Sequence, residues 1–231
     1  TKLFSMEVLM MKIGTDQKNC ICQKGRSRRV GQTGCRGIIG IKTEQRAEYA
    51  ICFVAVLVIK VEGLQIGNAE NTEAATGCTV LLFGKDGAPA GLDVRGGGPA
   101  SRESELLKPM AAAQIIHAIL LSGGSAFGLD AAGGVQKYLE ERGIGFDVGV
   151  TKVPLVCQSD LFDLTVGRMD VRPDAAMGYA ACLGAEHNNY RDGNYGAGTG
   201  ASVGKMTGMG TCMKSGIGSY AVQLGDLKVG A

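Results

Sequence analysis

Residues 115–143 read IIHAILLSGGSAFGLDAAGGVQKYLEERG, and this stretch carries the signals that predict the fold class. Residues 115–121 are almost continuously apolar, which is typical of a short strand buried on both faces. After the glycines, the apolar residues Leu129, Ala132, Val135 and Leu139 recur at helical spacing. Gly143 stands where a left-handed residue ends a helix. A strand, a glycine turn and a helix in this order predict a protein of mixed α/β (α+β) class.

The turn between the two elements consists of Ser122, Gly123, Gly124 and Ser125. Ser125 is a candidate cap for the start of the helix. Glycines at a helix N-terminus leave backbone N–H groups uncrowded, which suits a carboxylate, another anion or a developing oxyanion. We therefore expect these four residues to lie near a bound substrate.

The segments around this stretch predict further elements. Residues 79–83 form an apolar, β-branched strand, and the turn at 85–87 predicts residues 89–94 as its hairpin partner. Residues 173–182 predict an alanine-rich helix with Pro173 in its first position. Residues 216–231 predict two strands joined at Gly225 and Asp226. The second strand runs to the last residue, which leads us to expect that the sequence is truncated and the fold incomplete at its C-terminal end.

The first 60 residues differ in character from the rest. They carry 11 Lys and Arg against 4 Asp and Glu, whereas residues 61–231 carry 13 against 18. Residues 1–48 have no sustained hydrophobic period, so we expect residues 1–60 to be poorly ordered or not a native part of the protein. The basic charge lacks the interleaved aromatic residues of a nucleic-acid-binding arm. The expected division is residues 1–60 and residues 61–231.

The cysteines and histidines give little support for a metal site. The eight cysteines contain no CxxC pair, and the sequence has two histidines. Scattered reduced thiols favour a cytoplasmic protein without cofactor or metal. The longest apolar run, residues 50–59, is too short to span a bilayer, so no membrane partner is expected. His117 lies within an apolar run and is predicted to be a core residue.

Two sequence motifs near residue 200 are incomplete. Residues 200–204 match the G-x-S-x-G nucleophile elbow, but no Asp and His partners follow in chain order. Gly204 and Lys205 resemble the end of a P-loop, but Met206 stands where a magnesium-binding Ser or Thr is needed. Lys205 itself is either a solvated lysine or a desolvated one that polarises a carbonyl group.

Six blocks, taken in order, resemble successive signatures of the L-aminopeptidase/D-esterase family, which includes the nylon-oligomer hydrolases. The blocks are TGCTVLL at 76–82, GLDVRGGGP at 91–99 with Arg102 and Glu103, HAILLSGGSAFGLDAA at 117–132, GIGFDVG at 143–149, RPDAAMGYAAC at 172–182, and GAGTGASVGK at 196–205. The resemblance covers residues 61–231.

This resemblance implies an αββα sandwich of the N-terminal-nucleophile kind and a self-processing peptidase. Such a precursor cuts itself before a Ser or Thr, whose hydroxyl then attacks amides while its α-amino group acts as base. The family's nucleophile and an active-site Asn lie beyond residue 231, in or before a smaller subunit, so we expect this chain alone to be inactive. Lys205 matches a lysine of the active site in the nylon-hydrolase branch. Phe162 falls where some aminopeptidases carry an active-site Tyr, and it lacks the hydroxyl.

Three hypotheses follow. The first is a large subunit of an amide hydrolase acting on small peptides, amides or esters, which assembles with its own C-terminal subunit into a homo-oligomer. The second is acyl transfer to an amine, as in ornithine acetyltransferases of the same superfamily. The third is a non-catalytic module that binds an anion or carboxylate at residues 122–125.

Overall fold

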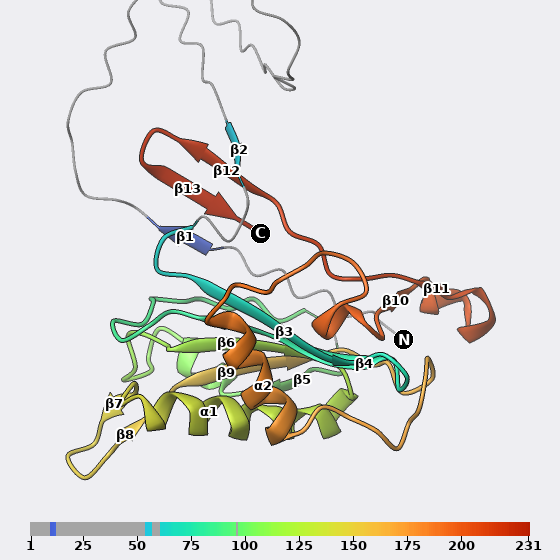
Figure 1. Ribbon diagram of the computed structural model, residues 1–231, viewed down its shortest axis with the longest axis horizontal. Helices are drawn as coiled ribbons and strands as arrows, with labels where there is room; N and C mark the ends of the chain where they lie inside the picture. Colours follow the sequence, from blue (N-terminus) through green and yellow to red (C-terminus); the bar gives the residue numbers. More distant parts are fainter. Residues whose placement is uncertain (1–9, 13–53, 57–60, 96) are drawn as a thin grey trace, which may run out of the picture.

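A computed structural model describes residues 10–12, 54–56, 61–95 and 97–231 of the chain (Figure 1). Its central sheet has five strands in the order β3-β4-β6-β9-β5. They span Gln65–Asn71 (β3), Thr76–Leu82 (β4), Ala100–Arg102 (β5), Ala118–Ser122 (β6) and Val156–Asp160 (β9). β6 and β9 are parallel, and the other neighbours in the sheet are antiparallel. Mixed pairing of this kind with packed helices makes the protein α+β, as the sequence predicts.

Two α-helices cover one face of this sheet (Figure 1). They are α1, Ala131–Glu141, and α2, Ala175–Ala185. All seven residues of β4 are buried, because β4 lies inside the sheet with apolar clusters above and below it. The cluster under the helices includes Val80, Leu120, Val135, Leu139 and Val156. The helices approach each other closely, since a Cβ at Gly134 or Gly178 would overlap a backbone oxygen of the other helix.

The opposite face of the central sheet carries a second apolar cluster, which includes Ile66, Phe83, Ile119 and Ala221. Ala221 comes from a second sheet with the strand order β1-β13-β12-β2. Its strands are Met10–Lys12 (β1), Val54–Val56 (β2), Ala221–Leu224 (β12) and Leu227–Gly230 (β13). Figure 1 shows the β12–β13 hairpin on the side of the central sheet away from α1 and α2. Among the described residues the α-helices lie on one face only, so the full αββα sandwich stays a prediction.

The remaining elements of the described residues are short. Two small antiparallel pairs are formed by β7 (Phe146–Asp147) with β8 (Lys152–Val153), and by β10 (Ser202–Val203) with β11 (Met213–Lys214). The 3-10 helices are η2 (Ser104–Leu107), η3 (Ser125–Asp130), η4 (Gly196–Gly198), η5 (Lys205–Thr207) and η6 (Met209–Thr211). The segment from β10 to β11 extends from one end of the body (Figure 1).

Several predictions from the sequence are confirmed. The apolar run at 115–121 forms β6, shifted towards its C-terminal end, and the following helical pattern forms η3 and α1. Gly143 ends this region with φ 64°, the left-handed conformation expected of a helix stop. The C-terminal hairpin forms with Gly225 and Asp226 in its turn. His117 is a core residue, 1% exposed, whose Nδ1 accepts the Leu155 N–H at 3.1 Å. Burial lowers the pKa of this histidine.

Three local predictions are wrong. Residues 89–94 form no strand, because β3 and β6 already occupy the two sides of β4 and only Ala88 bridges to Ile116. Ser125 caps no helix; it is the first residue of η3, has φ 54°, and the preceding Gly124 makes no side-chain cap. Helix α2 begins at Ala175 rather than Pro173, since the Asp174 side chain accepts the Met177 N–H at 2.9 Å.

Most of residues 1–60 lie outside the described residues, so the predicted disorder of that segment and the division near residue 60 stay predictions. Within the part that the structure describes, every helix is too short or too polar to cross a bilayer.

Candidate functional site

The turn at residues 122–125 connects β6 to η3 and is held by bonds within the chain. The Gly123 N–H donates to Gly77 O at 2.9 Å, the Gly124 N–H to Asp163 Oδ1 at 2.7 Å, and the Ser125 N–H to Leu161 O at 3.0 Å. Ser122 is 1% exposed, and its hydroxyl donates to Gly123 O at 3.1 Å. Three successive backbone donors of this turn therefore have acceptors in the protein. The geometry gives no support to an anion cradle here, and contact with substrate stays a prediction for these four residues.

Asp163 contacts the turn at residues 122–125 through its carboxylate and is 3% exposed. Its Oδ2 accepts the Thr76 hydroxyl at 2.7 Å, so the two carboxylate oxygens have one donor each from β4 and from the turn. Buried charge is tolerated in proteins where hydrogen bonds replace lost water, as they do here. The sequence reasoning did not single out Asp163, although it follows Phe162 in the same short segment.

Lys205 is the first residue of η5 and is half-buried. Its ammonium donates to the Phe162 carbonyl at 2.8 Å and lies 5.9 Å from the centre of the Phe162 ring. The structure thus brings together the two residues that the resemblance to the family pairs in one site. The preceding Gly204 has φ 81°, a left-handed conformation that glycine adopts without strain and that turns the chain into η5. Phe162 is 44% exposed, and its ring lies beside the positive charge of Lys205.

Lys214 is a second lysine in this region that the sequence reasoning passed over. Its ammonium, with three N–H donors, lies within hydrogen-bond distance of four oxygens, which are Asn194 Oδ1 at 2.6 Å, Ser215 O at 2.8 Å, Gly198 O at 3.1 Å and Ala201 O at 3.2 Å. Partial burial lowers the pKa of Lys214, and the nearby charge of Asp163 acts in the opposite direction. Lys214 fixes the glycine-rich loop before β10. In the sequence, Lys214 could have been found as the next charged residue after Lys205.

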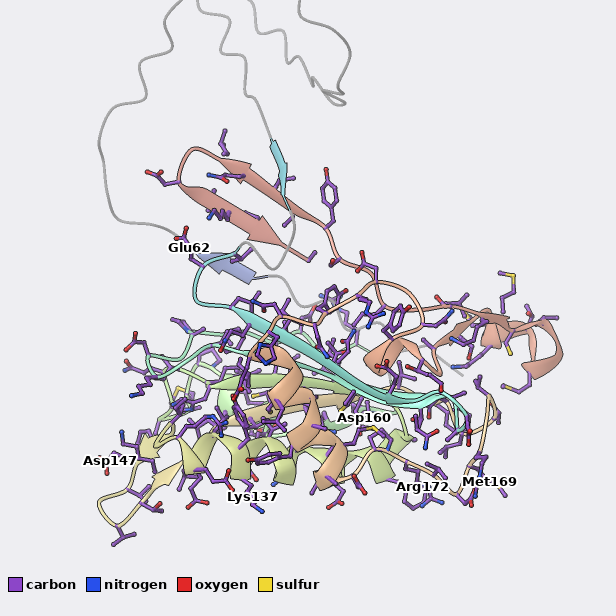
Figure 2. All side chains as sticks on the ribbon, in the orientation of Figure 1. Glu62, Lys137, Asp147, Asp160, Met169 and Arg172 are labelled. Carbon is purple, nitrogen blue, oxygen red and sulfur yellow. The ribbon has the colours of Figure 1, made fainter. Side chains whose placement is uncertain are left out.

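Asp160 ends β9 and has unusual surroundings (Figure 2). Its Oδ1 accepts the Gln158 side-chain amide at 2.8 Å, whereas its buried Oδ2 has no partner among the described residues. Burial, reinforced by the charge of Asp163, raises the pKa of Asp160 to about 7, although the bond from Gln158 acts in the opposite direction. Figure 2 shows Asp160 within the body, whereas Met169 and Arg172 lie on an outer loop.

Ser202, the serine of the G-x-S-x-G match, does not have the geometry of a nucleophile elbow. It lies in β10 and pairs with Lys214 across the small sheet, not on a turn between a strand and a helix. Its hydroxyl oxygen is buried and without a hydrogen-bond partner in the described part of the chain. A general base within reach is required for a serine nucleophile, so the elbow hypothesis has no support.

Comparison with known families gives a match that includes most of the described residues. A profile of peptidase family S58 matches residues 57–231, and this range contains the turn, Phe162, Asp163 and Lys205. The chain belongs to peptidase family S58. This membership confirms the resemblance to L-aminopeptidases and nylon-oligomer hydrolases that the six sequence blocks carry.

Individual relatives in the family are aminopeptidases and oligomer hydrolases by name. The chain is 36% identical over 184 residues to an uncharacterized aminopeptidase of Mycobacterium leprae, covering 72% of this chain and 48% of the relative. It is 32% identical over 167 residues to a 6-aminohexanoate-oligomer endohydrolase of a Kocuria species, covering 72% of this chain and 44% of the relative. The chain therefore spans about half the length of the curated relatives that it matches.

Solved structures show the same fold. A β-aminopeptidase from a Burkholderia species matches with a TM-score of 0.52 at 20% identity, covering 74% of this chain and 49% of that protein. A Pyrococcus horikoshii protein matches with a TM-score of 0.54 at 21% identity, covering 73% of this chain and 50% of that protein. At this level of identity the similarity concerns the fold.

Proposed function

We propose that this chain is the larger part of an amide hydrolase that acts on short peptides, amides or esters with a free amino end. The match to peptidase family S58 carries the proposal, because it includes both the core strands and the segment around Lys205. The relatives named as aminopeptidases and as 6-aminohexanoate-oligomer endohydrolases share amide bond cleavage.

In this proposal the nucleophile lies on a part of the protein that follows residue 231. It is a Ser or Thr that self-cleavage leaves at a new N-terminus, and its α-amino group serves as the general base. The hydroxyl attacks the substrate carbonyl, the leaving amine takes a proton, and water then hydrolyses the acyl-enzyme. The chain covers less than half of the length of each of the two relatives described above, which supports a further segment in the whole protein.

Lys205 is the catalytic residue that this chain contributes. Its bond to the Phe162 carbonyl uses one of three N–H groups, which leaves donors for a substrate carbonyl or a tetrahedral oxyanion. Phe162 offers an exposed ring beside the ammonium but no hydroxyl, so an acid–base role for a phenol at this position is excluded. The Ser122–Ser125 turn shapes one wall of the site in this proposal through its bonds to Asp163 and Leu161.

The proposed partners are the segment that carries the nucleophile, as a small subunit, and further copies of the protein in a cytoplasmic homo-oligomer. Acyl transfer is the alternative and uses the same acyl-enzyme. It differs from hydrolysis because an amine, rather than water, accepts the acyl group.

The experiment uses the gene product that continues beyond residue 231. Mass spectrometry detects self-cleavage before a Ser or Thr, and release of p-nitroaniline from aminoacyl-p-nitroanilides measures hydrolysis. We expect cleavage and turnover together. Acetyl transfer between ornithine derivatives without turnover of the anilides would instead favour the transferase, and a protein that neither cleaves itself nor turns over would contradict the proposal.

A further inference from the structure

Asp163 connects three segments that are far apart in the sequence. One carboxylate oxygen accepts the N–H of Gly124 in the turn after β6, and the other accepts the hydroxyl of Thr76 at the start of β4. Both contacts are 2.7 Å long and both are buried. Hydrogen bonds to a charged acceptor are about twice as strong as neutral ones, so this carboxylate fixes its own backbone firmly against the sheet.

Glycines enclose the same carboxylate on two further sides. A Cβ at Gly123 would overlap Asp163 Oδ2, and one at Gly200 would lie 2.5 Å from the Cβ of Asp163. Gly200 begins the segment that leads through β10 to Lys205. The side chain of Asp163 is therefore packed between the turn and the loop that carries the proposed catalytic lysine.

The backbone next to Asp163 provides the acceptor for that lysine. The carbonyl of Phe162, the preceding residue, accepts the Lys205 ammonium at 2.8 Å. The position of this carbonyl depends on where the chain is fixed at residue 163, because a peptide unit is planar and the two residues are adjacent.

We infer that Asp163 is a positioning residue of the site, which holds the Phe162 carbonyl where it orients the ammonium of Lys205. The inference rests on the proposed function for its consequence in catalysis. The dependence of the Lys205 ammonium's position on Asp163 is a structural claim, and it is measured without any assay of turnover.

The test compares two buried threonines of β4. Thr76→Val removes the hydroxyl that donates to Asp163, whereas Thr79→Val removes a hydroxyl that donates to Asn68 Oδ1 at 2.8 Å. The two residues are 2% and 1% exposed, but the Thr79 hydroxyl also accepts the Ala197 N–H at 3.1 Å. Thr79→Val therefore loses one buried hydrogen bond more than Thr76→Val, which makes it a stringent control for general loosening of the core. Asp163→Ala and Asp163→Asn complete the series. The amide side chain introduced by Asp163→Asn retains an oxygen for the Gly124 N–H and offers an N–H that the Thr76 hydroxyl can accept.

The readout is the rate at which acetic anhydride labels Lys205, measured by mass spectrometry against the exposed Lys85 in the same protein. A freed ammonium loses its hydrogen bond and becomes more accessible, so we expect labelling of Lys205 to rise roughly two- to tenfold in Thr76→Val and further in Asp163→Ala. Thr79→Val and Asp163→Asn are expected to label Lys205 at the rate of the unmodified protein.

Equal labelling of Lys205 in the two threonine variants would overturn the inference, as would an unchanged rate in folded Asp163→Ala. Where the gene product shows turnover, Thr76→Val is expected to lower kcat with KM unchanged, because misplacing a group that acts on the transition state leaves ground-state binding intact. A protein without turnover would contradict the proposed function, but the labelling comparison would still decide the role of Asp163.

Discussion

The ammonium of Lys205 lies 2.8 Å from the carbonyl oxygen of Phe162, and this contact joins segments that are 43 residues apart in the chain. Lys205 lies in a short 3-10 helix, whereas Phe162 follows β9 of the central sheet. A flexible side chain loses conformational entropy when it is held in one place, and the bond to a carbonyl offsets part of that loss. The arrangement presents a cation with free N–H groups beside an exposed aromatic ring.

Replacing Lys205 by methionine tests its catalytic role. Methionine is unbranched and fills the space of the lysine side chain up to Cε, but it has no ammonium. Amide turnover by the complete gene product is therefore expected to fall by roughly 10²- to 10³-fold, the usual effect of losing an oxyanion donor. Lys85→Met, at an exposed turn, is the control and is expected to retain full turnover. A Lys205→Met enzyme with unchanged kcat/KM would exclude the role.

The Asp160 carboxyl predicts a pH dependence of stability. Its pKa is about 7 in the folded protein against 3.8 for the ordinary group, so the folded state binds this proton more tightly than the unfolded state. The stabilisation is fully present below about pH 4 and is lost as the pH rises to about 7, by up to about 4 kcal/mol. Urea unfolding from about pH 4 to about pH 8 measures this loss.

Asp160→Asn is expected to remove this contribution from the pH profile, because its amide does not titrate. Asp86→Asn, in an exposed turn, is expected to leave the profile as it is. If the free energy of unfolding changed equally with pH in the unmodified protein and in Asp160→Asn, the assignment of this pH dependence to Asp160 would be wrong.

Two neighbouring glycines in α1 predict opposite effects on stability. A Cβ at Gly134 would overlap the Ala175 carbonyl oxygen of α2, whereas a Cβ at Gly133 has Ala175 Cβ as its nearest neighbour, at 3.9 Å. Gly134→Ala is therefore expected to lower the free energy of unfolding by about 1–3 kcal/mol, the usual cost of overpacking. Gly133→Ala is expected to raise it by about 0.5–1 kcal/mol, the gain of alanine over glycine in a helix. Similar values for the two variants would contradict the close helix contact.

The four described cysteines are free and predict an order of reactivity. Burial raises the pKa of Cys157 to about 11 and that of Cys182 to about 12, and it raises the pKa of the buried Cys78 thiol further. The thiolate is the reactive form, so these three are expected to label slowly with iodoacetamide at about pH 8 in native buffer, and the half-buried Cys212 first. In urea all four are expected to label at similar rates. Native labelling of Cys182 as fast as Cys212 would contradict the burial.

The parts of the fold that the sequence predicts are those fixed by local patterns. The apolar run of β6, the period of α1, the left-handed Gly143 and the C-terminal hairpin follow from spacing and turn chemistry within a few residues. Strand β9 was not predicted, because its buried residues Val156 and Cys157 are followed by Gln, Ser and Asp, which break the apolar run. Its place beside β6 depends on parallel pairing across a whole helix.

The candidate site was predictable only in part for a similar reason. Lys205 and Phe162 could be named from the family's motifs, but the bond between them depends on tertiary structure. The turn at 122–125 looked like an anion site because its backbone donors are uncrowded by side chains. Their acceptors, Gly77, Asp163 and Leu161, come from two other strands or the loops after them, and no local pattern reveals such partners.

The most direct test of whether the nucleophile lies outside this chain measures amide turnover by residues 1–231 alone and after mixing with the separately produced segment that follows residue 231. Residues 1–231 alone are expected to release no p-nitroaniline, and turnover after mixing is expected to fall by roughly 10²- to 10³-fold in Lys205→Met. Turnover by residues 1–231 alone would contradict the claim that the nucleophile lies outside this chain.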